Sequence, residues 1–304
     1  MRRTALVRVI VLFAVANSAA RAADAPGPVS APAEVIAAHN AWADSIRHIW
    51  SRAAVTINVP IDKKREQHDL DGHFFIAKPD RLFVHGQVLG QDVFRLGMNA
   101  ERFWLWIRPG VNTVWTGRRG GKGERDFLLS PADLMAAYGM SRIDLARDAA
   151  AEFVAGRRHY VLTEQQRAGG ALLPHRRIWF DRTTLRPVRV DLFDDVGRRL
   201  VMAELLAYQA VGDTPVCTTY RARFYGDEDV ALVLRLSRVS LEKKPNPRLF
   251  EYRLPPGANE RDLDAPAAGP GPTGIPLAGD LGRRAPFAPR AVRAHCAAGT
   301  ACPP

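Results

Sequence analysis

Residues with chemical potential are few and scattered along this 304-residue chain. It holds eight histidines, but the His-Glu-x-x-His pattern of zinc hydrolases is missing. His68, His73 and His85 fall in or beside different expected strands. Because a metal site needs convergent ligands, scattered surface or half-buried histidines are the simpler interpretation. We therefore expect no metal site and no cofactor.

Other stretches that resemble catalytic motifs fail on spacing. "GRRGGKGER", Gly117–Arg125, is basic and glycine-rich but lacks the GxxxxGK[ST] pattern of a phosphate-binding loop. The paired acids of "DLFDD", Asp191–Asp195, fall at an expected hairpin turn, where exposure to solvent explains them more simply. No Gly-x-Ser-x-Gly elbow of a serine hydrolase occurs. The sequence gives no positive reason to predict an enzyme, and an envelope hydrolase is the least favoured alternative.

The first residues predict export. Basic side chains precede a short apolar run, "VIVLFAVA", which ends in small residues and the Ala20-Arg21-Ala22 triplet. That layout is typical of a secretory signal peptide and too short for a membrane span. We expect a signal peptide over 1–22, a linker over 23–32 and a soluble periplasmic protein. No cysteine lies near the cleavage point, so no lipid anchor is expected.

Charge and cysteine content exclude further classes. The formal net charge is +11, but the basic residues are spread rather than gathered into a stripe, so no nucleic-acid partner is expected. Three cysteines are too few for a disulfide scaffold. Cys296 and Cys302 are close enough in sequence to pair in an oxidising compartment. Cys217 is then left as a buried thiol.

The stretch Pro32–Trp50 carries the strongest helical pattern. Apolar side chains recur there every three or four residues, which gives one stripe along a helix. A second, short helix is expected in "SPADLMAAYG", Ser130–Gly139, with Ser130 as its N-cap and Gly139 as its stop. The stripe of the long helix consists of Val35, Ile36, His39, Trp42, Ile46 and Ile49.

From Ala53 onwards the apolar period changes to two, which predicts strands. The links between them are short, and a parallel crossover needs about a dozen residues, so neighbouring strands should be antiparallel. We expect a mostly β (α+β) domain over 33–260, built on a curved antiparallel sheet of about eleven strands. Beyond it, 261–304 is rich in Pro, Gly and Ala and predicts a disordered tail.

One stretch of strands is apolar on both faces. In Lys78–Ile107, Leu82 and Val84 alternate with Phe83 and His85, and the stretch ends in "RFWLWI". Two interpretations stay open: a central strand buried on both sides, or a strand lining an apolar cavity inside a bent sheet. A shift of one residue would exchange the two faces.

The chain resembles the periplasmic lipoprotein-localisation carriers of the LolA/LolB type. An amphipathic helix opens the expected domain, and three segments follow in the family's order: "FFIAKPDRLF", "GMNAERFWLWI" and "FEYRLPPGA". The resemblance implies an incomplete β-barrel with an N-terminal helix and a lid helix. It also places Lys78 where the family has a basic residue that helps to hold the lid shut. Lysine is a poorer multi-donor clamp than arginine.

The resemblance further implies a carrier that binds an acylated lipoprotein or another lipid and carries it towards the outer membrane. The chain would be a monomer with transient contacts to an inner-membrane donor and an outer-membrane acceptor. A lipid-sensing regulatory module that docks a membrane protein is the alternative. The implied lid residues are Leu134, Met135 and Tyr138, and the implied cavity residues are Leu82, Val84, Val88, Phe103, Leu105, Ile107 and Trp115.

Overall fold

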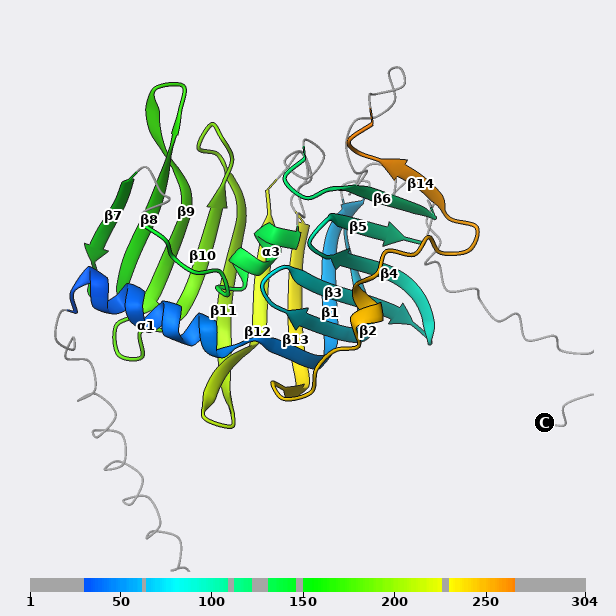
Figure 1. Ribbon diagram of the computed structural model, residues 1–304, viewed down its shortest axis with the longest axis horizontal. Coiled ribbons are helices and arrows are strands. Elements are labelled where there is room, and N and C mark those ends of the chain that lie inside the picture. The colour runs from blue at the N-terminus through cyan, green and yellow to red at the C-terminus, as the bar shows by residue number, and fades with distance from the viewer. Residues whose placement is uncertain are drawn as a thin grey trace, which may run out of the picture.

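The protein is described by a computed structural model that covers residues 30–61, 64–108, 112–121, 131–145, 150–225 and 230–265. One sheet of 14 strands dominates it (Figure 1), in the order β14-β6-β5-β4-β3-β2-β1-β13-β12-β11-β10-β9-β8-β7. Every neighbouring pair is antiparallel except β14 with β6, which is parallel. The sheet ends at β14 and β7 and does not close into a barrel.

Two meanders make up this sheet. The first comprises β1 His48–Ile61, β2 Lys64–Ala77, β3 Arg81–Val88, β4 Gln91–Met98, β5 Arg102–Ile107 and β6 Thr113–Arg118. The second comprises β7 Ala150–Ala155, β8 His159–Ala168, β9 Ala171–Asp181, β10 Pro187–Phe193, β11 Arg199–Val211, β12 Thr214–Phe224 and β13 Val230–Ser240. Because β13 pairs with β1, the two meanders join along β1. The last strand, β14 Asn259–Asp262, pairs with β6 at the far edge.

The two α-helices among the described residues pack against the sheet. The long helix α1 spans Pro32–Ser45 and its side chains contact β9, β11 and β12 of the second meander. The short helix α3 spans Pro131–Ala137 and contacts β10 and β11 of the second meander and β4 of the first (Figure 1). A 3₁₀ turn, η2 Pro247–Phe250, follows β13 and contacts β3.

The expected fold class holds at the level of a mostly β, largely antiparallel, unclosed sheet, but the count of about eleven strands is wrong. The segment Lys64–Asp71 is mostly polar and lacks the apolar alternation of a strand, yet it pairs along its length with β1. The edge strands β7 and β14 are short, and β14 reads Asn-Glu-Arg-Asp, without apolar alternation. Their pairing is decided by neighbouring strands rather than by their own sequence.

The first helix is also shorter than expected. It ends at Ser45, and Ile46 is already extended, with φ −94° and ψ 92°. The chain then enters β1, where His48 pairs with Ala77. Ile46 and Ile49, which the sequence placed on the helical stripe, are still fully buried. Pairing with β2 replaces the last turn of the helix without exposing its apolar residues.

Candidate functional site

The ten residues expected to form a cavity and its lid meet on one face of the sheet. Leu82, Val84, Phe103, Leu105 and Trp115 are buried in the main core cluster. Val88 and Ile107 are partly buried and pack against the same cluster. The lid residues Leu134, Met135 and Tyr138 belong to it as well. These residues therefore share one face of the sheet, while their roles as cavity and lid stay predictions.

Tyr138 anchors α3 in this core. Its ring meets Phe74 edge-on at 5.2 Å and Tyr220 at 4.8 Å between ring centroids. Complete burial raises the pKa of its hydroxyl well above the usual value. Gly139 then turns the chain with φ +70°, and a Cβ there would lie 3.1 Å from the Pro187 ring. Glycine therefore both permits the turn and lets it approach β10 closely.

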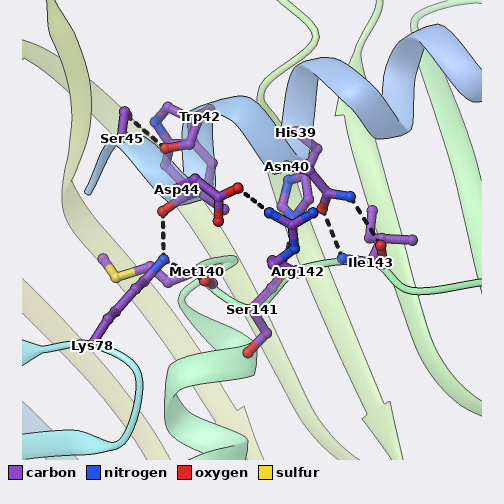
Figure 2. Close-up of polar contacts among 11 residues, drawn as sticks. His39, Asn40, Trp42, Asp44, Ser45, Lys78, Met140, Ser141, Arg142 and Ile143 are labelled. Carbon is purple, nitrogen blue, oxygen red and sulfur yellow. Dashed lines mark hydrogen bonds and ion pairs between the residues drawn. The ribbon is translucent and has the colours of Figure 1, made fainter. Parts of the chain in front are cut away.

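The segment that follows, Met140–Ile143, is here called the strap. Figure 2 shows Lys78 reaching from the β2–β3 turn to both the strap and α1. Its Nζ donates to the Met140 carbonyl at 2.7 Å and to the Ala43 carbonyl at 2.5 Å. The expected latch residue thus lies between lid and helix, and its function as a latch remains a prediction.

Two side chains of α1 hold the strap next. His39 Nε2 donates to the Ser141 carbonyl at 3.0 Å, which requires the tautomer protonated at Nε2. Asn40 makes a reciprocal pair with Ile143: its Nδ2 donates to the carbonyl at 2.9 Å, and its Oδ1 accepts from the Ile143 N–H at 2.9 Å (Figure 2). These hydrogen bonds are formed with main-chain groups of the strap, so they do not depend on its side chains.

The remaining carbonyl, that of Arg142, accepts a hydrogen bond from Arg176 Nη2 of β9 at 3.0 Å. Arg176 is itself fixed by a bidentate ion pair with Glu164 of β8, in which Nη2 reaches Oε1 at 2.6 Å. Both side chains are almost fully buried. The Arg142 side chain pairs with Asp44 of α1. All four carbonyls of the strap are therefore bound by side chains from three different parts of the fold.

Two of these groups have shifted pKa values. The pKa of His39 is lowered to about 4, chiefly by burial and in part by the nearby cations Arg176 and Lys78, against the opposing effect of its hydrogen bond to Ser141. His39 is therefore neutral at pH 7, and its Nδ1 has no hydrogen-bond partner within the described part of the chain. Burial also lowers the pKa of Lys78 to about 8, against the attraction of Asp44. Lys78 still carries its charge at neutral pH.

Among the described residues, several buried polar atoms lack a hydrogen-bond partner, and two of them, Trp115 Nε1 and Tyr220 Oη, belong to the main core cluster. Trp115 is 3% exposed, and its buried Nε1–H donates to no group among the described residues. An unpaired buried donor costs about 1–3 kcal/mol, so such atoms call for an explanation. This donor belongs to one of the residues expected to line a cavity.

The opposite face of the first meander is covered by the chain's own C-terminal segment. Phe83, Trp104 and Trp106 lie under residues 247–258. Asn99 Nδ2 donates to the Phe250 carbonyl at 3.0 Å, and Asn112 Nδ2 to the Gly257 carbonyl at 2.7 Å. Strand β5 is thus buried on both sides, as one of the two interpretations of "RFWLWI" held.

Sequence reasoning found Lys78 in this region but not its companions. His39 was read as part of an apolar stripe, and its burial fits that reading, but nothing in the spacing indicated a contact with the strap. Asn40 carries no signal beyond its position beside that stripe. Glu164 and Arg176 occur in strands whose charged residues are expected to face water, so their burial depends on the tertiary structure.

Several expectations fall outside the described residues. They are the expected signal peptide over 1–22, most of the linker, the part of the tail from 266 onwards, and the cysteines Cys296 and Cys302. Cys217 is buried, and its thiol is free. Within the described ranges, no cluster of three His, Cys, Asp or Glu side chains suited to a metal was found. None of the described helices is both long and apolar enough to cross a membrane.

Comparisons with known proteins give a likeness of fold. No protein-family model matches the chain, and no curated protein matches it. A LolA superfamily protein from Nitrosomonas europaea is 14% identical, with a TM-score of 0.48 over 71% of this chain and 97% of that one. A domain named for outer membrane lipoprotein sorting, from Vibrio parahaemolyticus, is 12% identical, with a TM-score of 0.48 over 71% and 94%.

A DUF1329 family protein from Desulfovibrio piger matches similarly, at 15% identity and a TM-score of 0.47 over 71% of this chain and 97% of that one. At such identities and scores the comparison concerns only the course of the backbone. It assigns no activity to this chain.

Proposed function

We propose that this chain is a periplasmic carrier that takes the acyl chains of a lipidated protein, or of another lipid, into the core beneath α3. The observation that supports this most is the way the lid is held. Leu134, Met135 and Tyr138 cover the apolar face, while the strap behind them is bound through its four carbonyls by Lys78, His39, Arg176 and Asn40. No covalent chemistry is required.

The energetics of such a lid favour reversible binding. Displacing α3 exposes Leu134, Met135 and Tyr138 to water, and each such side chain contributes about 1.5–3 kcal/mol when buried. Each methylene of an entering acyl chain returns about 0.8 kcal/mol. Cargo and lid therefore compete for one apolar surface, which keeps the net affinity modest and allows release to an acceptor.

The unpaired Trp115 donor gives the cargo a polar contact. The acyl chains of lipoproteins and lipids are joined through ester or amide carbonyls, which accept hydrogen bonds. Trp115 Nε1–H is buried among apolar side chains and has no hydrogen-bond partner among the described residues. A carbonyl placed there would form a hydrogen bond that the closed protein leaves unmade, and this would offset part of the cost of opening.

The tip of the β3–β4 hairpin offers a contact with a membrane. Leu89 is 99% exposed and has φ +50°, a conformation that residues with a Cβ rarely adopt. Neither folding nor turn geometry favours leucine at this position. In a carrier, an apolar side chain at this tip would touch the lipid surface from which cargo is received or to which it is delivered.

Native mass spectrometry tests the proposal. The protein is purified from the periplasm of a Gram-negative host, sprayed intact and then extracted for lipids. We expect acylated species at one per chain, and a synthetic diacylated lipopeptide should bind to the emptied protein. A chain free of lipid that also fails to bind this lipopeptide would overturn the proposal. Recovery of a membrane-protein ectodomain in place of lipid would favour the regulatory alternative.

The variant Trp115→Phe separates cargo binding from folding. It keeps an aromatic ring in the core and removes only the unpaired donor, so we expect the lipopeptide to bind about five- to tenfold more weakly. The free energy of unfolding should fall by no more than about 1–2 kcal/mol, since the lost ring contacts are partly offset by the loss of an unpaired polar group. Trp50→Phe, on the opposite face, is the control and should leave binding unchanged.

A further inference from the structure

A cavity lies on the face of the first meander that points away from α3. Its volume is about 290 Å³, and it is partly open to solvent. Phe83 and Trp104 form part of its lining, and both alternate along their strands with the core residues Leu82, Phe103 and Leu105. Side chains on alternate positions point to opposite faces of a sheet. This cavity is therefore separate from the core beneath the lid.

Aromatic rings form the apolar side of this cavity and are held in place. Gly97 makes room for Trp104, because a Cβ at Gly97 would lie 2.1 Å from the indole ring. Tyr252, in the C-terminal segment, packs on Trp104 with ring centroids 5.7 Å apart. Trp106 donates from Nε1 to Asn112 Oδ1 at 3.1 Å. The aromatic wall is thus fixed by contacts that do not involve a ligand.

Charged side chains and His85 form the polar part of the lining, beside the apolar residues Val114, Leu249 and Pro255. Arg95 pairs with Asp92 at 2.5 Å, and Arg253 pairs with Glu251 at 2.6 Å. Arg248 is a third guanidinium of the lining; it is exposed and has no carboxylate partner among the described residues. The cavity therefore offers both donors and acceptors, with one unpaired positive charge.

We propose that this cavity binds a single sugar ring that carries a phosphate group, either as a free sugar phosphate or as the headgroup of a phosphorylated lipid. A sugar ring has C–H faces that pack on aromatic rings and hydroxyl groups that both donate and accept hydrogen bonds. The phosphate would pair with Arg248, whose planar guanidinium suits bidentate contacts with phosphate oxygens.

Size and polarity favour this ligand class over others. Sites for drug-sized ligands enclose about 300–1,000 Å³, so a cavity of about 290 Å³ suits one ring rather than a peptide. An acyl chain beside the Asp92–Arg95 and Glu251–Arg253 ion pairs would remove water from these groups without forming a hydrogen bond to them, which favours a ligand with hydroxyl groups. The inference is independent of the carrier function, because its residues lie on the other face of the sheet.

Calorimetric titration with glucose 1-phosphate tests the inference in the full chain, with glucose and inorganic phosphate as separate titrants. We expect glucose 1-phosphate to bind at least about tenfold more tightly than either fragment, since each supplies only one of the two contacts. Flotation with phosphatidylinositol vesicles, compared with phosphatidylcholine vesicles, then tells whether the same chemistry is recognised on a lipid.

Two variants locate the site. Arg248→Glu reverses the unpaired charge on an exposed side chain and should weaken glucose 1-phosphate binding by at least about tenfold. Arg223→Glu is the matched control: Arg223 is an exposed arginine on β12, with no ion pair among the described residues, and this change should alter binding less than twofold. Tyr252→Leu keeps apolar volume but removes an aromatic ring. This change should weaken the binding of glucose 1-phosphate while leaving the binding of inorganic phosphate unchanged.

Each outcome of these titrations either supports the proposed site or overturns it. Tight binding that is lost in Arg248→Glu and weakened in Tyr252→Leu supports the site, whether or not vesicles also bind. Absence of binding, equal binding of inorganic phosphate, or binding that survives Arg248→Glu would overturn it. Because Arg248 lies on the surface, folding of this variant can be checked by its unchanged thermal midpoint.

Discussion

The two faces of strands β3–β6 have covers of different kinds. On one face, α3 and the strap close over a core that is almost wholly apolar, and the strap is held by side chains that donate to its carbonyls. On the other face, residues 247–258 cover aromatic rings and leave a cavity lined by charged groups. One set of alternating strands therefore has a buried apolar face on one side and, on the other, an aromatic face with charged groups at a partly open cavity.

This difference bears on which cover would move in the proposed carrier. The strap is fixed by side chains from α1, from β9 and from the β2–β3 turn, so in the proposed carrier a small number of polar contacts would control access to the apolar core. The C-terminal segment instead continues into β14, which joins the sheet through pairing with β6. It is anchored as part of the sheet, and we expect it to stay in place when α3 moves.

The largest effect is expected from the buried ion pair behind the strap. Glu164→Ala leaves Arg176 buried without its carboxylate, which destabilises a fold by about 3–5 kcal/mol. Chemical denaturation measures the loss. Glu204→Ala is the control, because Glu204 pairs with the exposed Arg221, and surface pairs contribute about 0–1 kcal/mol. Equal, small losses in both variants would show that the strap does not depend on its buried anchor.

Acid should weaken the strap through His39. Its pKa is about 4 in the folded protein and 6.5 for an unperturbed histidine. The unfolded chain therefore binds this proton first, and the stability contributed by neutral His39 is full above pH 6.5 and lost as pH falls towards 4. The expected loss is about 3 kcal/mol.

Unfolding free energies of the wild type and His39→Gln between pH 7 and 4 measure this contribution. Glutamine keeps an N–H donor for the Ser141 carbonyl but does not titrate in this range. The difference between the two proteins should grow in favour of the variant as pH falls. A constant difference would mean that His39 is not buried as the structure has it.

The smallest effect on stability is expected at the β3–β4 tip. Leu89→Asn places a residue that tolerates positive φ at this position, so stability should stay the same or rise by a few tenths of a kcal/mol. Association with lipid vesicles should fall. Val196→Asn is the control, since Val196 is a 59% exposed residue in another hairpin turn. Unchanged vesicle association in Leu89→Asn would remove the tip from the proposal.

Much of the fold could be predicted because apolar periodicity records which face of each strand is buried. Leu82, Val84, Phe103 and Leu105 share one face, as their spacing indicates, whereas the spacing alone leaves open which face is turned inward. The Lys78 contact was reached only through a family resemblance, since a lone lysine before proline predicts nothing by itself. His39, Asn40 and Arg176 could not be predicted, because their roles depend on a strap more than 30 residues from each.

Two strand segments escape detection by apolar periodicity for one physical reason. The start of β2 and the whole of β14 are polar, and nothing in their own sequences favours a strand. They form because β1 and β6 present unpaired backbone groups beside them, which must find partners. Local sequence encodes burial well, but it does not encode pairing at an edge.

Hydrogen exchange at the strap tests the central claim most directly. The Ile143 N–H donates to Asn40 Oδ1 in the closed protein, so its exchange reports whether the strap is bound. On addition of a synthetic diacylated lipopeptide, we predict faster exchange at Ile143, while amides of β14 keep their protection. Binding of the lipopeptide with Ile143 as protected as before would contradict the account, because cargo would then enter without moving the lid.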